Sequence, residues 1–258
     1  MIRCSSLAPL LGSLALLAGA TSAAAQCLPP PRNAEVPGFS LCKDWPAFAD
    51  QSISLLSEQV PDPSDTGTDD GTYNLQLAVL DRSSGQALAS YEQPAAFVSD
   101  AFRLESVKLD TGRFQLTPQV RAFGVRAAFE GSSRVNPFNQ TWLSLYVREG
   151  STLRPVLEKF VAHSYNGEWD GQCAGEGTKT TRTLDIAKTR SHGYADLIVR
   201  SVSVSTQSKK VGEECQSTSV AAKPVVSTLH YDGQRYVLPN GFSGILYRRS
   251  IRKLDEPA

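Results

Sequence analysis

The chain has 258 residues, with 26 basic and 26 acidic side chains and a formal net charge of zero. Because both signs are interspersed along the chain, we exclude a broad electrostatic surface for nucleic acids. The length suits one large domain or two small lobes. The HExxH, phosphate-loop and GxGxxG motifs are absent from the sequence, and we expect no cofactor.

The first 25 residues have the pattern of a cleaved export signal. A short positive start precedes the apolar segment LAPLLGSLALLAGA, which is too short to span a bilayer. Ala23 and Ala25 give the small-residue pattern of a cleavage site, so we predict cleavage before Gln26. This places the mature protein in the periplasm or, alternatively, outside the cell. Lipid anchoring through Cys27 is a second alternative, although Gln26 is larger than the residue that such a site prefers.

The cysteines support export. Of the five in the chain, Cys4 lies in the signal. The four that remain are an even number, which in an oxidising compartment indicates two disulfides, with three connectivities open. We favour the pairs that close the shortest loops, which are Cys27–Cys42 and Cys173–Cys215. A metal site is not favoured, because no CxxC occurs and no histidine lies near a cysteine.

Residues 26–72 are predicted to precede the main domain. Residues 26–44 are rich in proline and indicate a coil stapled by its two cysteines. A short helix is predicted next, since Asp44 can cap it and Pro46 suits a first turn. The apolar residues at near-helical spacing are Phe48, Leu55, Leu56 and Val60. Residues 61–71 are predicted to be an acidic loop.

From Tyr73 onward the apolar period becomes two, which predicts half-buried antiparallel strands. Alternation recurs in the segments 73–79, 121–129, 142–147 and 195–204. Asp232-Gly233 is a hairpin turn signal between two further alternating runs. We therefore predict an all-β domain over 73–242, built of antiparallel sheets. A basic tail, 243–258, follows and contains YRRSIRK.

An internal duplication is one interpretation of the domain. Segment 75–88 aligns with 143–157, each an alternating strand, a charged turn with glycine and a second strand. The two repeats would be 73–141 and 142–242. They would form a sandwich or a partial propeller.

The segments LYVREGSTLRPVL, ADLIVR and LHYDGQRYVLP resemble blades of secreted bacterial FG-GAP or VCBS-type β-propellers. The chain is also similar to uncharacterised exported proteins of Gram-negative bacteria, a likeness that implies no activity. The propeller resemblance implies calcium in acidic DxDxDG loops. The nearest loop here, DTGTDDG, offers Asp65, Asp69 and Asp70, but Gly67 stands where a ligand is needed. We therefore expect no metal in this loop, and Asp65, Asp69 and Asp70 would be the ligands if one did bind.

The stretch YNGEWDGQCAGEG, 165–177, holds the candidate catalytic residues. On a strand, Glu168 and Asp170 would point the same way, as a glycosidase carboxylate pair requires, with Glu176 in reserve. The spacing resembles the E-x-D-x-x-E motif of laminarinase-like β-sandwich hydrolases, in which Cys173 would be glutamate. We favour the alternative, a turn-rich crossing anchored by Cys173. Such a loop can still carry binding function.

Aromatic side chains give candidate binding residues. Trp142 and Tyr146 fall on the strand face opposite Leu143 and Leu145. If that face is wet, they would form a binding surface with Trp169 as a further candidate. We favour a second layer that covers Trp142 and Tyr146.

Other catalytic arrangements lack a local signature. GFSGI does not match G-x-S-x-G, and the three histidines are scattered along the sequence. The leading hypothesis is a non-enzymatic β-rich protein that binds an envelope component or a protein partner. The alternatives are a glycan hydrolase using Glu168 and Asp170, and an immunity or inhibitor protein. No transmembrane segment is expected after the signal.

Overall fold

The computed structural model describes residues 27–60 and 71–244. In these residues the fold is all-β, with no helix. The predicted signal, the candidate ligands Asp65, Asp69 and Asp70, and the tail beyond Gly244 lie outside the described residues. The strands are β1 (Gly38–Asp44), β2 (Gln51–Glu58), β3 (Gly71–Asp81), β4 (Ala87–Ser99), β5 (Phe102–Gln115), β6 (Arg121–Gly131), β7 (Phe138–Glu149), β8 (Thr152–Trp169), β9 (Gly175–Ser191), β10 (Tyr194–Val211), β11 (Glu214–Ala221) and β12 (Val225–Leu229).

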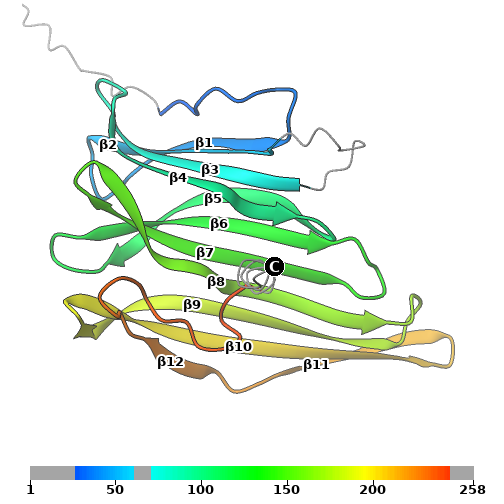
Figure 1. The fold of residues 1–258 in the computed structure, drawn as a ribbon. Coiled ribbons are helices and arrows are strands. Elements are labelled where there is room, and N and C mark those ends of the chain that lie inside the picture. Colours follow the sequence, from blue (N-terminus) through cyan, green and yellow to red (C-terminus); the bar gives the residue numbers. More distant parts are fainter. Residues whose placement is uncertain (1–26, 61–70, 245–258) are drawn as a thin grey trace, which may run out of the picture.

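The strands form one large mixed sheet in which almost every pair is antiparallel and joins neighbours in the chain (Figure 1). Among the described strands the succession breaks twice: β4 and β5 are not paired, and β12 pairs with β10 rather than with β11. Strand β4 instead meets β8 in parallel through the single pair Ser90–Thr152. At the other border β1 lies beside β5, where the Lys43 ammonium donates to the Leu109 carbonyl over 3.2 Å. The sheet therefore folds over itself, with β1–β4 covering β5–β8.

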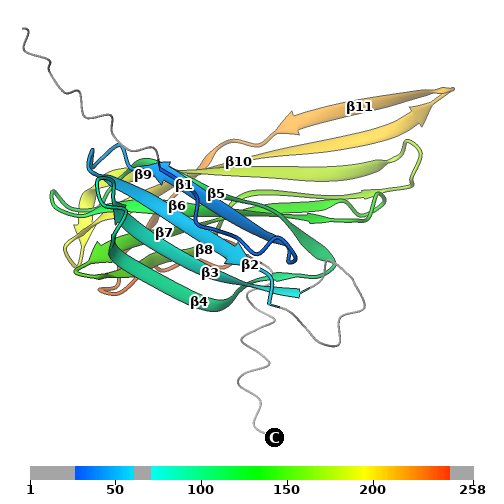
Figure 2. The same ribbon diagram turned by 90° about the horizontal axis from the view of Figure 1, so that it is seen from above.

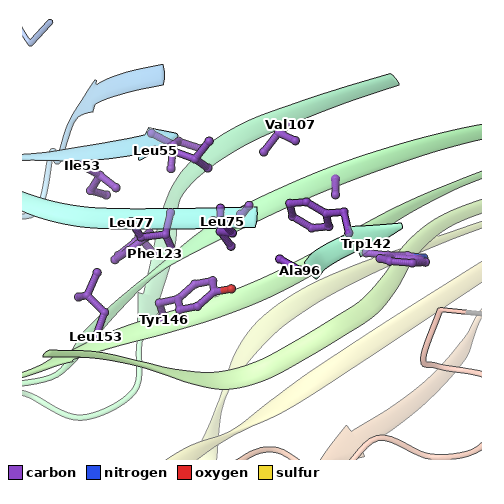
Figure 3. Packing of buried hydrophobic residues seen from close by; sticks show 14 of the residues in the cluster. Ile53, Leu55, Leu75, Leu77, Ala96, Val107, Phe123, Trp142, Tyr146 and Leu153 are labelled. Atoms are coloured by element: carbon purple, nitrogen blue, oxygen red, sulfur yellow. The ribbon is translucent and has the colours of Figure 1, made fainter. Parts of the chain in front are cut away.

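The first hydrophobic core lies between these two groups of strands (Figure 3). The period-two residues of β3 (Tyr73, Leu75, Leu77 and Val79) and of β6 (Phe123, Val125, Ala127 and Phe129) point into it. Trp142 and Tyr146 of β7 lie in the same core. The predicted inward faces of both strands are confirmed, and the predicted second layer over Trp142 and Tyr146 is present.

A second core lies on the opposite face of the same central strands. Leu143, Leu145 and Val147 of β7 pack there against Leu197 and Val199 of β10. The segment after β12 closes this core, and its Asp232-Gly233 turn is confirmed: Asp232 N donates to Arg235 O over 2.9 Å, and Gly233 has φ of 104°. Central strands buried on both faces explain why their sequences are so apolar.

The predicted N-terminal helix is wrong. Its residues form the end of β1, a turn and the strand β2. Trp45 N donates to Gln51 O over 3.1 Å and Phe48 N to Trp45 O over 2.8 Å, which builds a hairpin turn at the proposed helix start. In β2, Ile53 and Leu55 alternate with serines and are fully buried. Pairing with β1 and β3 therefore outweighs the local helix-start signals.

The predicted disulfide pairing is confirmed. Cys27 is bonded to Cys42, with Cα atoms 5.5 Å apart, and Cys173 to Cys215, with Cα atoms 5.6 Å apart. The first bond ties the N-terminal coil to β1, which replaces part of the expected coil of 26–44. The boundary proposed between repeats 73–141 and 142–242 falls inside β7. The duplication itself stays a hypothesis.

Candidate functional site

The outer halves of β8, β9, β10 and β11 form a four-stranded extension, which we call the distal ribbon (residues 163–169, 175–181, 202–211 and 214–221). Its sequences are rich in Ser, Thr and Lys, of which Thr favours strands, and all three supply little apolar surface to bury. The β10–β11 hairpin projects beyond the rest of the molecule (Figure 2). Polar side chains are therefore presented on both faces of a long sheet.

One face of the distal ribbon holds a groove of about 510 Å³. The strand register aligns its polar lining in cross-strand rows, because Asn166 faces Thr178, Thr178 faces Ser205, and Gln207 faces Thr218. Val220 forms the outer border of the groove and is 64 % exposed. The lining offers amides, hydroxyls and carboxylates, which together can donate and accept hydrogen bonds to a polar ligand.

Two of the three candidate acids meet in this groove. Glu168 and Glu176 are register partners across β8 and β9, and both are exposed. Directly opposed residues on one sheet face have Cβ atoms about 4.5–5.5 Å apart. The sequence contained a signal for this pair: both residues are equally distant from Gln172, the centre of the Asp170-Gly171 turn.

Asp170 does not join them. Its Oδ1 accepts the backbone N–H groups of Gln172 and Cys173, each over 2.8 Å. These backbone hydrogen bonds, with that from Gln172 the largest cause, hold the pKa of Asp170 below its ordinary value. Asp170 therefore shapes the β8–β9 turn, as expected for the turn-rich interpretation of this stretch.

The opposite face of the ribbon carries Tyr165 and Trp169. Both aromatic rings lie over glycines: a Cβ on Gly177 would meet the Tyr165 hydroxyl at 2.7 Å, and Gly175 is in equally close contact with Trp169. Trp169 is half-buried, and it lies away from Glu168 and Glu176. The groove thus has no aromatic platform among its lining residues.

Trp142 and Tyr146 are core residues, each 3 % exposed. The Trp142 indole N–H donates to Gln140 Oε1 over 2.8 Å, so its polar atom is satisfied inside the protein. Burial raises the pKa of the Tyr146 hydroxyl. Neither side chain is available to a partner at the surface.

A polar cluster that the sequence did not reveal lies at the β9–β10 turn. Asp196, 2 % exposed, has Oδ1 3.2 Å from His230 Nδ1, and Ser191 Oγ lies 3.2 Å from the same nitrogen. In a serine hydrolase triad, serine and aspartate contact different ring nitrogens. Here both face Nδ1, so the arrangement is not a triad. His192 is nearby and contacts the Tyr231 carbonyl oxygen at 2.8 Å.

In the described part of the chain, no group of three or more His, Cys, Asp or Glu residues is placed to hold a metal ion. Across the same residues, no helix is long and apolar enough to cross a membrane. Comparison of the chain with models of protein families, with curated proteins and with solved structures finds no match.

Proposed function

We propose that the protein is an exported, non-enzymatic binding protein whose groove receives a hydroxyl- and amide-rich envelope polymer, such as a glycan strand. The observation that carries this proposal is the row of amide, hydroxyl and carboxylate side chains across four strands of the distal ribbon. A flat polar sheet face has hydrogen-bonding groups at the regular spacing that an extended polymer can follow. The Gln207 side chain makes no hydrogen bond to another described residue, so its amide is available to such a polymer.

The scaffold supports this proposal. The Cys173–Cys215 bond joins the β8–β9 turn to β11 across the end of the distal ribbon. Hydroxyl pairs such as Thr180 Oγ1 to Ser203 Oγ, 2.9 Å apart, link its strands. A rigid surface loses less conformational entropy when a ligand binds. Two disulfides are compatible with the oxidising compartment that export implies.

The test is binding of the oxidised, exported chain to purified peptidoglycan and envelope polysaccharides, compared with the variant Asn166→Ala/Gln207→Ala. We expect the double variant to bind at least tenfold more weakly, since buried hydrogen bonds to a ligand are lost. Glu92→Gln, an exposed change on β4 far from the groove, is the matched control. Equal binding by the groove variant and the control would refute the groove as the site.

A glycan hydrolase is the second candidate, and one observation favours it. Glu168 and Glu176 are directly opposed across β8 and β9, so rotation of the two side chains can bring their carboxyl groups to the roughly 5–5.5 Å separation of retaining glycosidases. The catalytic pair would then be Glu168 and Glu176 rather than Glu168 and Asp170. Zymography on the same polymers with Glu168→Gln decides the matter: clearing that the variant abolishes supports catalysis, and equal clearing, or none by either protein, removes it.

A further inference from the structure

The outer edge of β11 is unpaired in the described part of the chain. All eight of its residues are exposed, and among the described strands it pairs with β10 alone. Ala222 N donates to Ser203 O over 2.8 Å, so the even-numbered residues direct their backbone groups towards β10. In an antiparallel strand, alternate residues direct theirs to the other side. The N–H and C=O groups of residues 215, 217, 219 and 221 therefore face outward.

An exposed edge of this kind is a template for another strand. Natural edges are commonly protected by charges, proline or a bulge. The stretch Cys215–Ala221 has none of these: it is neutral and contains Ser, Thr and Val. Charges and proline appear only at its ends, with Glu213 and Glu214 at one end and Lys223-Pro224 at the other.

The edge is complementary to itself. A two-fold axis perpendicular to the sheet leaves each side chain on the same face in both copies. Two paired residues must therefore be both even-numbered or both odd-numbered, because side chains alternate between the faces along a strand. Centred on Thr218, this register places Ser217 against Ser219 of the second copy. It also places Glu213 against Lys223, at both ends of the pairing. Hydrogen bonds between hydroxyl side chains, such as Thr–Thr and Thr–Ser, and opposite charges are among the cross-strand pairs that stabilise a sheet.

We propose that two copies of the chain associate through β11, antiparallel and centred on Thr218. The acidic end of each β11 then meets the basic end of the other, while Lys209 and Lys210 lie one strand further in, on β10. Val220, 64 % exposed in one copy, is covered by the stem of the partner's Gln216. Because the two-fold axis preserves faces, the grooves of both copies join into one surface across Thr218 and Val220.

The register is tested first by a cysteine placed on the axis. Thr218 directs its backbone groups towards β10, so Thr218 and its copy would form a non-hydrogen-bonded pair with Cα atoms about 4.5 Å apart, which suits a disulfide. The variant Thr218→Cys should give a covalent dimer under oxidation. Val220→Cys, on the same face but off the axis, should give at least tenfold less. Equal yields from the two, or no dimer from Thr218→Cys, would overturn the proposal.

The second test is a charge exchange followed by sedimentation equilibrium without ligand. Glu213→Lys and Lys223→Glu should each weaken dimerisation several-fold, because each places like charges together. The double exchange should restore the wild-type dimer, which a general change in charge would not do. A wild-type chain that stays monomeric at 100 μM would refute the dimer. These measurements contain no glycan, so their outcome tests the dimer independently of the proposed function.

Discussion

Glu168 of β8 lies directly opposite Glu176 of β9, with both carboxylates on the groove face of the distal ribbon. Like charges opposed on adjacent strands destabilise a sheet. The neighbouring rows contain neutral hydroxyl and amide pairs, which do not have this cost. The acid pair is therefore expected to have a role in the groove rather than in folding.

Replacing one of these acids should change the stability of the protein and its polymer binding in opposite directions. We expect Glu176→Lys to raise the free energy of unfolding by roughly 0.2–1 kcal/mol, because it turns a repulsive cross-strand pair into an attractive one. The same variant should bind the envelope polymer more weakly. Chemical denaturation and the binding assay measure the two effects. A variant less stable than the wild-type protein would contradict this account of the pair.

Trp142 gives a contrasting prediction, because its side chain is buried. Trp142→Ala should lower the free energy of unfolding by about 3–5 kcal/mol, through lost burial and the cavity left beside Phe129. It also leaves Gln140 Oε1 without the indole N–H. Trp169→Ala, on the half-exposed face of the distal ribbon, is the control and should cost clearly less. Thermal and urea unfolding provide the comparison.

The glycines beneath the ribbon aromatics should not be equivalent. A Cβ on Gly175 would collide with the backbone of β8, at Glu168 O and Trp169 Cα, which cannot move without disturbing the strand pairing. On Gly177 it would meet the end of the Tyr165 side chain, which can rotate away. Gly175→Ala should therefore destabilise by about 1–3 kcal/mol and Gly177→Ala by less. Similar losses in equilibrium unfolding would argue against the proposed packing.

The two disulfides should contribute unequally to stability. Cys173 and Cys215 are 42 residues apart, and Cys27 and Cys42 are 15 apart. The chain-entropy model assigns about 4 kcal/mol to the longer loop and about 3 kcal/mol to the shorter one. Paired serine substitutions at each bond, compared by urea unfolding, measure this order. The reverse order would show that unfolded-state entropy is not the main cause.

Acid unfolding should report on Asp81. Hydrogen bonds from Ser83 and Ser84, with the Ser83 hydroxyl the largest cause, lower its pKa to about 2. A depressed folded-state pKa adds stability that is fully present above the ordinary pKa near 4 and is lost as the pH falls to about 2. Asp81→Asn keeps an acceptor oxygen but cannot titrate. Its melting temperature should fall less between pH 4 and pH 2 than that of wild type or Glu92→Gln, and an unchanged slope would contradict this.

Much of the β domain could be predicted from local pattern. The period-two residues of β3, β6 and β7 lie in the cores as expected, since alternation directly reports which strand face is dry. The cysteine pairs were also predictable, because both bonds close the shortest available loops. The turn chemistry of Asp170-Gly171 predicted a turn-rich crossing, and the β8–β9 turn confirms it. The opposition of Glu168 and Glu176 was not predicted, because the pair was expected to be Glu168 and Asp170 on one strand.

Other features depend on contacts that no local pattern encodes. The helix predicted from Asp44 and Pro46 failed because β1 and β3 recruit the adjacent segment into the sheet, where Ile53 and Leu55 fill a core formed by distant strands. The Asp196–His230 contact joins β10 to the residue that follows β12 and required the tertiary fold. The exposed edge of β11 likewise appears only once the strand order is known.

The strand order also bears on how the molecule acquires its shape. Nearly every pairing joins consecutive strands, so hairpins can form with little loop-closure entropy and extend by addition of the next strand. The pairing of β4 with β8, by contrast, closes a loop from Ser90 to Thr152, and it forms one bridge in return for the entropy of that long loop. We expect the docking of β1–β4 onto β5–β8 to be the late, rate-limiting event of refolding, after two separately assembled meanders already exist.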